Sequence, residues 1–166
     1  MRRKPGLIFL CLFAFAATAT VFAQQEARKF DEMPQINCED AKARLDNLAI
    51  QLQQEPTAKG YIIFYGGKSY RTYVKKGRAY VAVQLPARRG EAKARIYPWK
   101  DYIINNRGVD GSRIEVIDGG YREGPMAEFW IVPAGAKPPV PTPTLKETDI
   151  KFRKGRFRAS ELVFDC

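Results

Sequence analysis

The most constraining feature of this sequence is a short, unbroken apolar run, Tyr61-Ile62-Ile63-Phe64-Tyr65, which two glycines follow. A run of this length without polar alternation is typical of a central strand that is covered on both faces. Such a strand needs a neighbour on each edge and a packing layer on each side. The chain has 166 residues, 45% of them hydrophobic, which is enough for one domain of ordinary size.

Two helices are predicted, one before this strand and one after it. The first begins at Asn37 as N-cap and ends before Pro56, and its apolar residues recur at helical spacing: Ala41, Leu45, Leu48, Ala49 and Leu52. The second runs from about residue 90 to 106, with Gly108 as its C-cap. Pro98 interrupts it, so we expect a kink, or a restart with Pro98 in the first turn.

Further strands are predicted around these helices. Residues 72–74 and 79–83 flank Lys75-Lys76-Gly77-Arg78 as a hairpin, and residues 114–117 and 128–132 are single strands, with Gly119-Gly120 opening a turn between them. The predicted fold class is a mixed α/β (α+β) two-layer sandwich spanning residues 24–136. A proline-rich connector (137–144) and a C-terminal β-hairpin extension (145–166), whose first strand includes the alternating residues 150–153, follow it.

The first 23 residues resemble a secretory leader rather than part of the fold. Three basic residues precede an apolar run from Leu7 to Ala17, and Val21-Phe22-Ala23 ends in a small residue. This pattern predicts a signal peptide cleaved near Ala23 and a periplasmic or secreted protein with no membrane span after cleavage. The alternative is a membrane anchor, for which the apolar run is at the short limit.

Two cysteines remain after this cleavage, Cys38 and Cys166, one near each end of the domain. An even number in an oxidising compartment favours one disulfide between them. The alternative is a pair of free thiols. If the disulfide forms, the last residue lies beside the start of the first helix.

Positive charge is concentrated in one segment. Residues 56–90 hold eight basic residues and no acidic one, whereas the chain after residue 23 has 25 basic and 18 acidic residues, a net charge of +7. Tyrosines such as Tyr73 are interleaved, and cations beside aromatic faces suit polyanions or sugars. The candidate ligand-binding residues here are Lys68, Arg71, Tyr73, Lys75, Lys76, Arg78, Arg88 and Arg89. A second, smaller basic patch follows residue 150: Lys151, Arg153, Lys154, Arg156 and Arg158.

A simpler interpretation of the hairpin is also open, in which its cations only protect an exposed edge strand from aggregation. The predicted leader argues against nucleic acid as the partner. The chain has no histidine, which excludes Ser-His-Asp and Cys-His catalysis and the commonest zinc ligand. We therefore expect no cofactor and no metal.

The order of motifs resembles the C-terminal, peptidoglycan-associating domain of the outer-membrane protein A (OmpA) family over about residues 30–133. The chain is also similar to a group of uncharacterised secreted bacterial proteins that share the Tyr-Gly-Gly and Gly-Gly-Tyr-Arg-Glu motifs at 65–67 and 119–123. The OmpA resemblance rests on Phe30-Asp31, Leu45-Asp46-Asn47-Leu48-Ala49, Arg95, Tyr102-Ile103, Gly108-Val109, Arg113-Ile114 and Gly119-Gly120. It implies a β-α-β-α-β-β order with the basic hairpin as an insertion.

The resemblance also implies a ligand site, because an aspartate and an arginine of that family hold the diaminopimelate of the wall peptide. Arg95 matches the arginine, and a guanidinium suits bidentate binding of a carboxylate. The place of the aspartate falls near Gly67-Lys68, where this sequence has no acid. Glu91, four residues before Arg95, either substitutes for it or is the helical salt-bridge partner of Arg95.

Other candidate chemistry has less support in the sequence. Asp110-Gly111-Ser112 and Asp118-Gly119-Gly120 lack calcium-loop spacing and are predicted to be turns. We expect Trp99 and Trp130 in the core rather than as platforms for sugar rings. A carboxylate pair of a glycan hydrolase would come from Glu115, Asp118, Glu123 or Glu128.

The sequence therefore predicts a non-catalytic envelope-binding domain that recognises an anionic, peptidoglycan-like wall or surface polymer through the basic hairpin and Arg95. The first alternative is a protein–protein interaction or structural module that docks another envelope protein by its sheet edge and proline-rich connector. The remote alternative is the hydrolase.

Overall fold

The computed structural model describes residues 25–34, 38–76 and 79–155, with the backbone alone for 70–76 and 79–82. The predicted leader, the Asn37 cap, the hairpin tip with Arg78, and Cys166 lie outside these residues. The leader, the cap and the disulfide therefore stay predictions.

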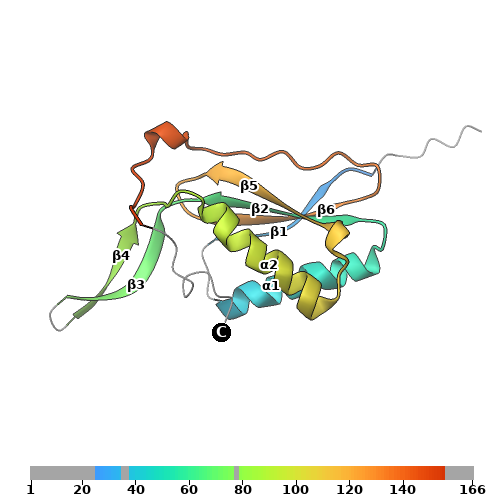
Figure 1. The fold of residues 1–166 in the computed structure, drawn as a ribbon, viewed down its shortest axis with the longest axis horizontal. Coiled ribbons are helices and arrows are strands. Elements are labelled where there is room, and N and C mark those ends of the chain that lie inside the picture. The colour runs from blue at the N-terminus through green and yellow to red at the C-terminus, as the bar shows by residue number, and fades with distance from the viewer. Residues whose placement is uncertain (1–24, 35–37, 77–78, 156–166) are drawn as a thin grey trace, which may run out of the picture.

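A four-stranded mixed sheet forms the centre of the molecule, in the order β1-β6-β2-β5 (Figure 1). Its strands are β1 (Arg28–Pro34), β2 (Lys59–Gly66), β5 (Ile114–Tyr121) and β6 (Met126–Val132). Strand β2 pairs with β6 antiparallel and with β5 in parallel. The apolar run that begins at Tyr61 thus lies in an inner strand with a neighbour on each side, as predicted.

Both long helices cover the same face of this sheet (Figure 1). Helix α1 (Cys38–Gln54) buries the five apolar residues whose spacing predicted it. Helix α2 (Glu91–Arg107) begins seven residues before Pro98 and continues through it, so of the two predicted alternatives, a kink or a restart, the restart at Pro98 is wrong. The predicted C-cap is confirmed, because Gly108 has a φ of 67° and its N–H binds the carbonyl of Ile104.

The two faces of the sheet bury different residues, because side chains alternate along a strand. On the helix side, Phe64 and Phe129 pack with Trp99 of α2 in the main core. On the opposite side, Tyr65 binds Glu128 and also meets the proline-rich connector at Thr142. In Figure 1 this part of the chain, in orange, runs along the sheet away from the helices.

The basic segment forms a hairpin of its own. Strands β3 (Ser69–Lys76) and β4 (Ala79–Leu85) pair antiparallel as a separate two-stranded sheet. Figure 1 shows this ribbon projecting from one end of the main sheet. The predicted hairpin strands are confirmed.

Two of the predicted β features are wrong. Strand β5 continues through Gly119-Gly120 to Tyr121 instead of turning there. The described part of the C-terminal extension has an isolated bridge between Tyr121 and Leu145 and a short 3-10 helix, Glu147–Asp149, but no strand at 150–153. The second half of that predicted hairpin lies outside the described residues. The fold class is therefore mixed α/β, with a four-stranded mixed sheet and two helices on one face.

Within the described ranges, none of the helices is both long enough and apolar enough to span a bilayer.

Candidate functional site

The predicted binding residues gather around the hairpin and its base. Lys68 lies just after β2, and four of the others lie along β3: Arg71, Tyr73, Lys75 and Lys76. The Cα register places Arg71 opposite Val83 and Lys75 opposite Tyr80. Arg88 and Arg89 lie in the loop between β4 and α2.

A cavity of about 410 Å³ lies at the base of this hairpin. It is where the carboxyl ends of the parallel strands β2 and β5 meet the root of the hairpin and the C-terminal segment. In open α/β sheets, ligand sites are typically found outside the carboxyl ends of the strands. Its walls are Gly67, Lys68, Gln84, Pro86, Ala87, Arg122, Glu123, Leu145, Asp149, Ile150 and Lys151.

The floor of this cavity is fixed by backbone contacts between β2 and the β5–β6 turn. The N–H of Lys68 donates to the carbonyl of Glu123 at 3.0 Å, and the N–H of Arg122 donates to that of Gly66 at 2.9 Å. A Cβ atom at Gly67 would collide with the backbone of Gly124. Only glycine permits this close approach, so Gly67 brings the two segments together.

Charges of both signs line the cavity. Lys68 and Glu123 form a loose ion pair with 3.7 Å between Nζ and Oε2, and both are well exposed. Lys151 and Asp149 lie on the C-terminal wall and are exposed as well. Exposed pairs of this kind contribute little to stability, so these charges remain available to a ligand.

The two arginines after β4 contact the C-terminal segment and β5. Arg89 pairs with Glu147, and its guanidinium lies 4.3 Å from the ring centre of Phe152. Arg88 is buried, and its carbonyl accepts a hydrogen bond from the hydroxyl of Tyr121 at 3.3 Å. Of these two predicted binding residues, Arg88 is buried, whereas the side chain of Arg89 is 67% exposed, so a binding role for Arg89 stays a prediction.

Arg95 lies in a different place from the hairpin. It lines a separate cavity of about 40 Å³ with Phe64 and Trp99. Its Nε donates to Oε1 of Glu91 at 3.2 Å, and the side chain of Glu91 is only 5% exposed. Of the two roles considered for Glu91, the helical salt bridge is the one observed. A ligand carboxylate would have to compete with Glu91 for Arg95.

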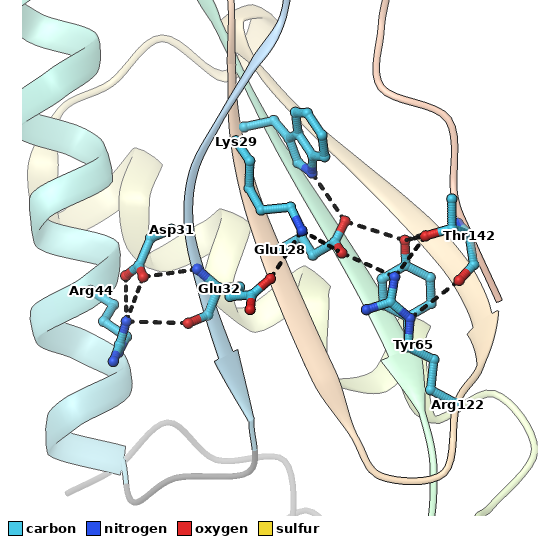
Figure 2. Close-up of polar contacts among 9 residues, drawn as sticks. Lys29, Asp31, Glu32, Arg44, Tyr65, Arg122, Glu128 and Thr142 are labelled. Atoms are coloured by element: carbon cyan, nitrogen blue, oxygen red, sulfur yellow. Dashed lines mark hydrogen bonds and ion pairs between the residues drawn. The ribbon is translucent and has the colours of Figure 1, made fainter. Parts of the chain in front are cut away.

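Sequence reasoning missed the most connected polar group, which is centred on Glu128 (Figure 2). This carboxylate is 3% exposed and accepts hydrogen bonds from Lys29 and Arg122, each at 3.0 Å, and from the indole of Trp130 at 3.2 Å. The hydroxyl of Tyr65 donates to Oε2 of the same carboxylate at 3.3 Å. Burial alone would raise the pKa of Glu128, but the hydrogen bonds from Lys29, Arg122 and Trp130 outweigh it, and the net pKa is lowered.

This network also holds the connector against the sheet. Arg122 donates to the carbonyl of Thr142 at 3.2 Å and to its hydroxyl at 2.7 Å, and the N–H of Thr142 donates to Tyr65 at 3.1 Å. The guanidinium of Arg122 lies 3.5 Å from the ring centre of Tyr65. Figure 2 shows these side chains converging from the sheet on the connector at Thr142.

The four acids considered for hydrolysis each have a different partner. Glu115 pairs with Lys59, Glu123 pairs with Lys68, and Glu128 forms the network described above. Asp118 accepts the N–H of Gly120. Asp110 likewise accepts the N–H of Ser112, as expected for a turn.

The two tryptophans differ in environment. Trp99 lies in the core, as predicted, at 7% exposure. Trp130 does not: it is half-buried on the face of the sheet away from the helices. Across the described part of the chain, no group of three metal-ligating side chains comes together.

The walls of the cavity come from four segments that are separated in the sequence, so the distribution of charge along the sequence could not predict it. Lys151 belongs to the smaller basic patch, and Arg122-Glu123 belongs to the Gly-Gly-Tyr-Arg-Glu motif, so both carried a signal. Neither the scan against protein-family models nor the search of curated proteins finds a match for this chain.

Proposed function

We propose that this protein is a non-catalytic, periplasmic or secreted binding domain, OmpA-like in outline, that holds an anionic, peptidoglycan-like polymer of the cell envelope. The polymer lies along the hairpin β3–β4 and enters the cavity at its base. The observation that carries this proposal is the placement of the acid-free basic segment on a projecting ribbon whose root opens into a cavity of about 410 Å³.

Charge supports this choice of ligand. Arg71, Lys75 and Lys76 lie on one eight-residue strand, and no acidic residue occurs between residues 56 and 90. A ribbon of this kind attracts a polyanion over a distance set by ionic strength. The cavity adds charges of both signs, which suits a wall polymer whose peptides carry carboxylates and ammonium groups.

The element order supports the OmpA-like outline. With the hairpin set aside, the described elements run β-α-β-α-β-β along the chain, with the parallel pair β2–β5 joined through α2. The chain departs from that family at the ligand site, because no acid follows β2 and Arg95 is already paired with Glu91. The hairpin end, rather than Arg95, is therefore the principal binding surface in this proposal.

A second candidate function is docking to another envelope protein. One observation favours it: Val140, an apolar side chain within the proline-rich connector, is 78% exposed. Proline-rich segments are common ligands of aromatic-lined grooves. An apolar interface of that kind responds weakly to salt, which separates the two candidates.

Co-sedimentation with purified peptidoglycan tests the proposal. The variant Arg71→Gln/Lys75→Gln/Lys76→Gln removes three hairpin cations, and Lys42→Gln/Lys93→Gln/Lys100→Gln removes three from the helices, so the two have the same net charge. We expect the wild type and the second triple variant to be retained at about 0.1 M salt and released towards 1 M, where the Debye length falls from about 10 Å to about 3 Å. The hairpin triple variant should be released at both salt concentrations.

Three results would contradict the proposal. Equal retention of the two triple variants would show that only net charge matters. Retention that survives high salt and disappears in Arg95→Ala would place the site at Arg95. If the wild-type protein is retained at neither salt concentration, the wall polymer is not its ligand and a protein partner is favoured.

A further inference from the structure

A second large cavity lies on the face of the sheet that the connector covers. Its volume is about 430 Å³, and it is distinct from the cavity at the hairpin base. Its apolar wall is made by Trp130, Pro139 and Ala136. Its polar lining residues are Gln25 and Glu26, which precede β1, and Lys137 of the connector, so an amide, a carboxylate and an ammonium group border the cavity.

Trp130 is held in a fixed orientation in this wall. Its indole N–H donates to Glu128 at 3.2 Å, and the Nζ of Lys29 lies 5.6 Å from the ring centre. Glu128 is itself held by Lys29 and Arg122, so rotating the ring would remove a donor from a buried carboxylate. The half-buried ring is therefore held rigidly in the cavity wall.

The chemistry of these walls matches a sugar ring. A pyranose has an apolar C–H face, which stacks on an aromatic ring, and an edge of hydroxyl or acetamido groups, which needs donors and acceptors. An apolar ligand would leave the amide and charged groups of the cavity unused, and a bare ion would leave the indole and proline unused. The volume is in the range that ligand sites for small molecules occupy.

We propose that this cavity binds one or two pyranose rings of an N-acetylated glycan, stacked on Trp130 with Pro139 beside them and with Gln25, Glu26 and Lys137 binding the polar edge. The inference rests on the proposed function in one respect, because such a glycan is the sugar component of the same envelope polymer. The hairpin end and this cavity are separate surfaces, so an experiment can contradict either proposal without contradicting the other.

The probe is the β-1,4-linked trimer of N-acetylglucosamine, titrated to about 10 mM and followed by tryptophan emission and by calorimetry. Because the chain has two tryptophans and Trp99 is buried, a saturable change of emission would report on Trp130. We expect Trp130→Ala to weaken calorimetric binding by about tenfold or more. The matched control is Tyr97→Ala, which removes an aromatic ring that is 54% exposed on α2 and should leave binding unchanged.

A second set of variants covers the case in which Trp130→Ala fails to fold. Glu26→Ala and Lys137→Ala change side chains outside the Glu128 network and should each weaken binding severalfold. Maltotriose, which lacks acetamido groups, should bind more weakly than the N-acetylated trimer. No saturable signal with wild-type protein, or equal affinity in the Trp130, Glu26 and Lys137 variants, would overturn the inference.

The hairpin triple variant distinguishes this inference from the proposed function. It should bind the trimer as the wild type does while losing retention on peptidoglycan, because a single sugar site of about millimolar strength is too weak to hold the protein in the pellet. Trimer binding without any retention on peptidoglycan would overturn the polymer proposal and leave the glycan cavity standing. Salt-sensitive retention on peptidoglycan without trimer binding would overturn the glycan cavity and leave the polymer proposal standing.

Discussion

Glu128 connects four segments of the protein from a position that water barely reaches. Its carboxylate binds Lys29 of β1, Trp130 of its own strand and Arg122 after β5, and the hydroxyl of Tyr65 joins it from β2. A buried carboxylate is tolerated only when its hydrogen bonds are made, and here they are made by two cations and two neutral donors. Removing the charge leaves both cations facing a neutral group.

We predict that Glu128→Gln lowers the free energy of unfolding by about 2 kcal/mol, because it replaces two charge-assisted hydrogen bonds to a buried carboxylate by weaker ones to an amide. Urea unfolding measures this change. The matched control is Glu32→Gln, which removes the exposed partner of the same Lys29 and should cost about 0.5 kcal/mol. Equal losses for the two variants would contradict the assigned role of Glu128.

The same residue gives a pH dependence whose sign follows from its pKa. Hydrogen bonds from Lys29, Arg122 and Trp130 outweigh burial and lower the pKa of Glu128 below its usual value of 4.5. Its contribution to stability is therefore fully present above about pH 4.5 and is lost as the pH falls through the lowered pKa. We predict that the acid limb of the stability curve is shallower in Glu128→Gln than in the wild type. Identical acid limbs in the two proteins would show that other carboxylates determine the loss of stability at low pH.

At the scale of elements, Arg113 shows how one side chain joins two of them. It precedes β5, and its guanidinium donates to the carbonyls of Leu52, Glu55 and Ala58 at 2.7–3.0 Å, where α1 ends and the turn into β2 begins. Carbonyls at the end of a helix have no partner within the helix. The cation also complements the negative end of the helix dipole.

The joint between β2 and the β5–β6 turn gives a prediction about two glycines. Gly67→Ala places a methyl group against the backbone of Gly124 and should lower the free energy of unfolding by about 2–4 kcal/mol. Gly124→Ala adds the same group where the nearest atom, the carbonyl oxygen of Lys68, is 4.0 Å away, so it should change stability by less than about 1 kcal/mol. Thermal unfolding of the two variants makes the comparison; a tolerated Gly67→Ala would mean that the joint opens freely.

Elements whose signal is local could be predicted from the sequence. The stripe Leu45, Leu48 and Leu52 indicated the buried face of α1, and the capping glycine Gly108 indicated the end of α2. The alternation at 150–153 was misleading for a tertiary reason. Phe152 packs on Tyr121 with ring centres 5.1 Å apart, and the N–H of Arg153 binds the carbonyl of Ala87, so this segment covers a loop instead of pairing as a strand.

The candidate site was predictable only in part. Its charged residues are close together in the sequence, but the walls of its cavity come from segments that are far apart in the sequence. The cations of β3 stand close together in the sequence, so composition found them. The cavity walls come from segments up to about eighty residues apart, and no local pattern brings Lys68, Arg122 and Lys151 together. Arg95 was selected by resemblance, and its partner Glu91 occupies the place where a ligand carboxylate would bind.

At the scale of the whole molecule, the sheet separates two unlike layers. The helices pack on one side in an apolar core, and the connector lies on the other over a polar network (Figures 1 and 2). The hairpin projects from one end of this arrangement. The three parts therefore contribute differently, because the core stabilises the fold, the connector borders the second cavity, and the hairpin end carries the basic charge.

A whole-molecule prediction concerns the two cysteines. Cys38 is the first residue of α1, and Cys166 lies outside the described residues. We predict that the denatured, unreduced protein from an oxidising compartment has no titratable thiol, and that reduction lowers the free energy of unfolding by about 5 kcal/mol because the closed loop is long. Two thiols per chain in the Ellman assay would contradict the disulfide.

The central claim is that the hairpin end of the molecule is the binding surface, and hydrogen exchange tests it most directly. Amide exchange is measured with and without soluble peptidoglycan fragments, for the wild type and for the hairpin triple variant. We predict slower exchange in β3, β4 and residues 145–151 of the wild type, and no such change in the variant. Slower exchange confined to α1, α2 or β1, with the hairpin unchanged, would contradict the claim.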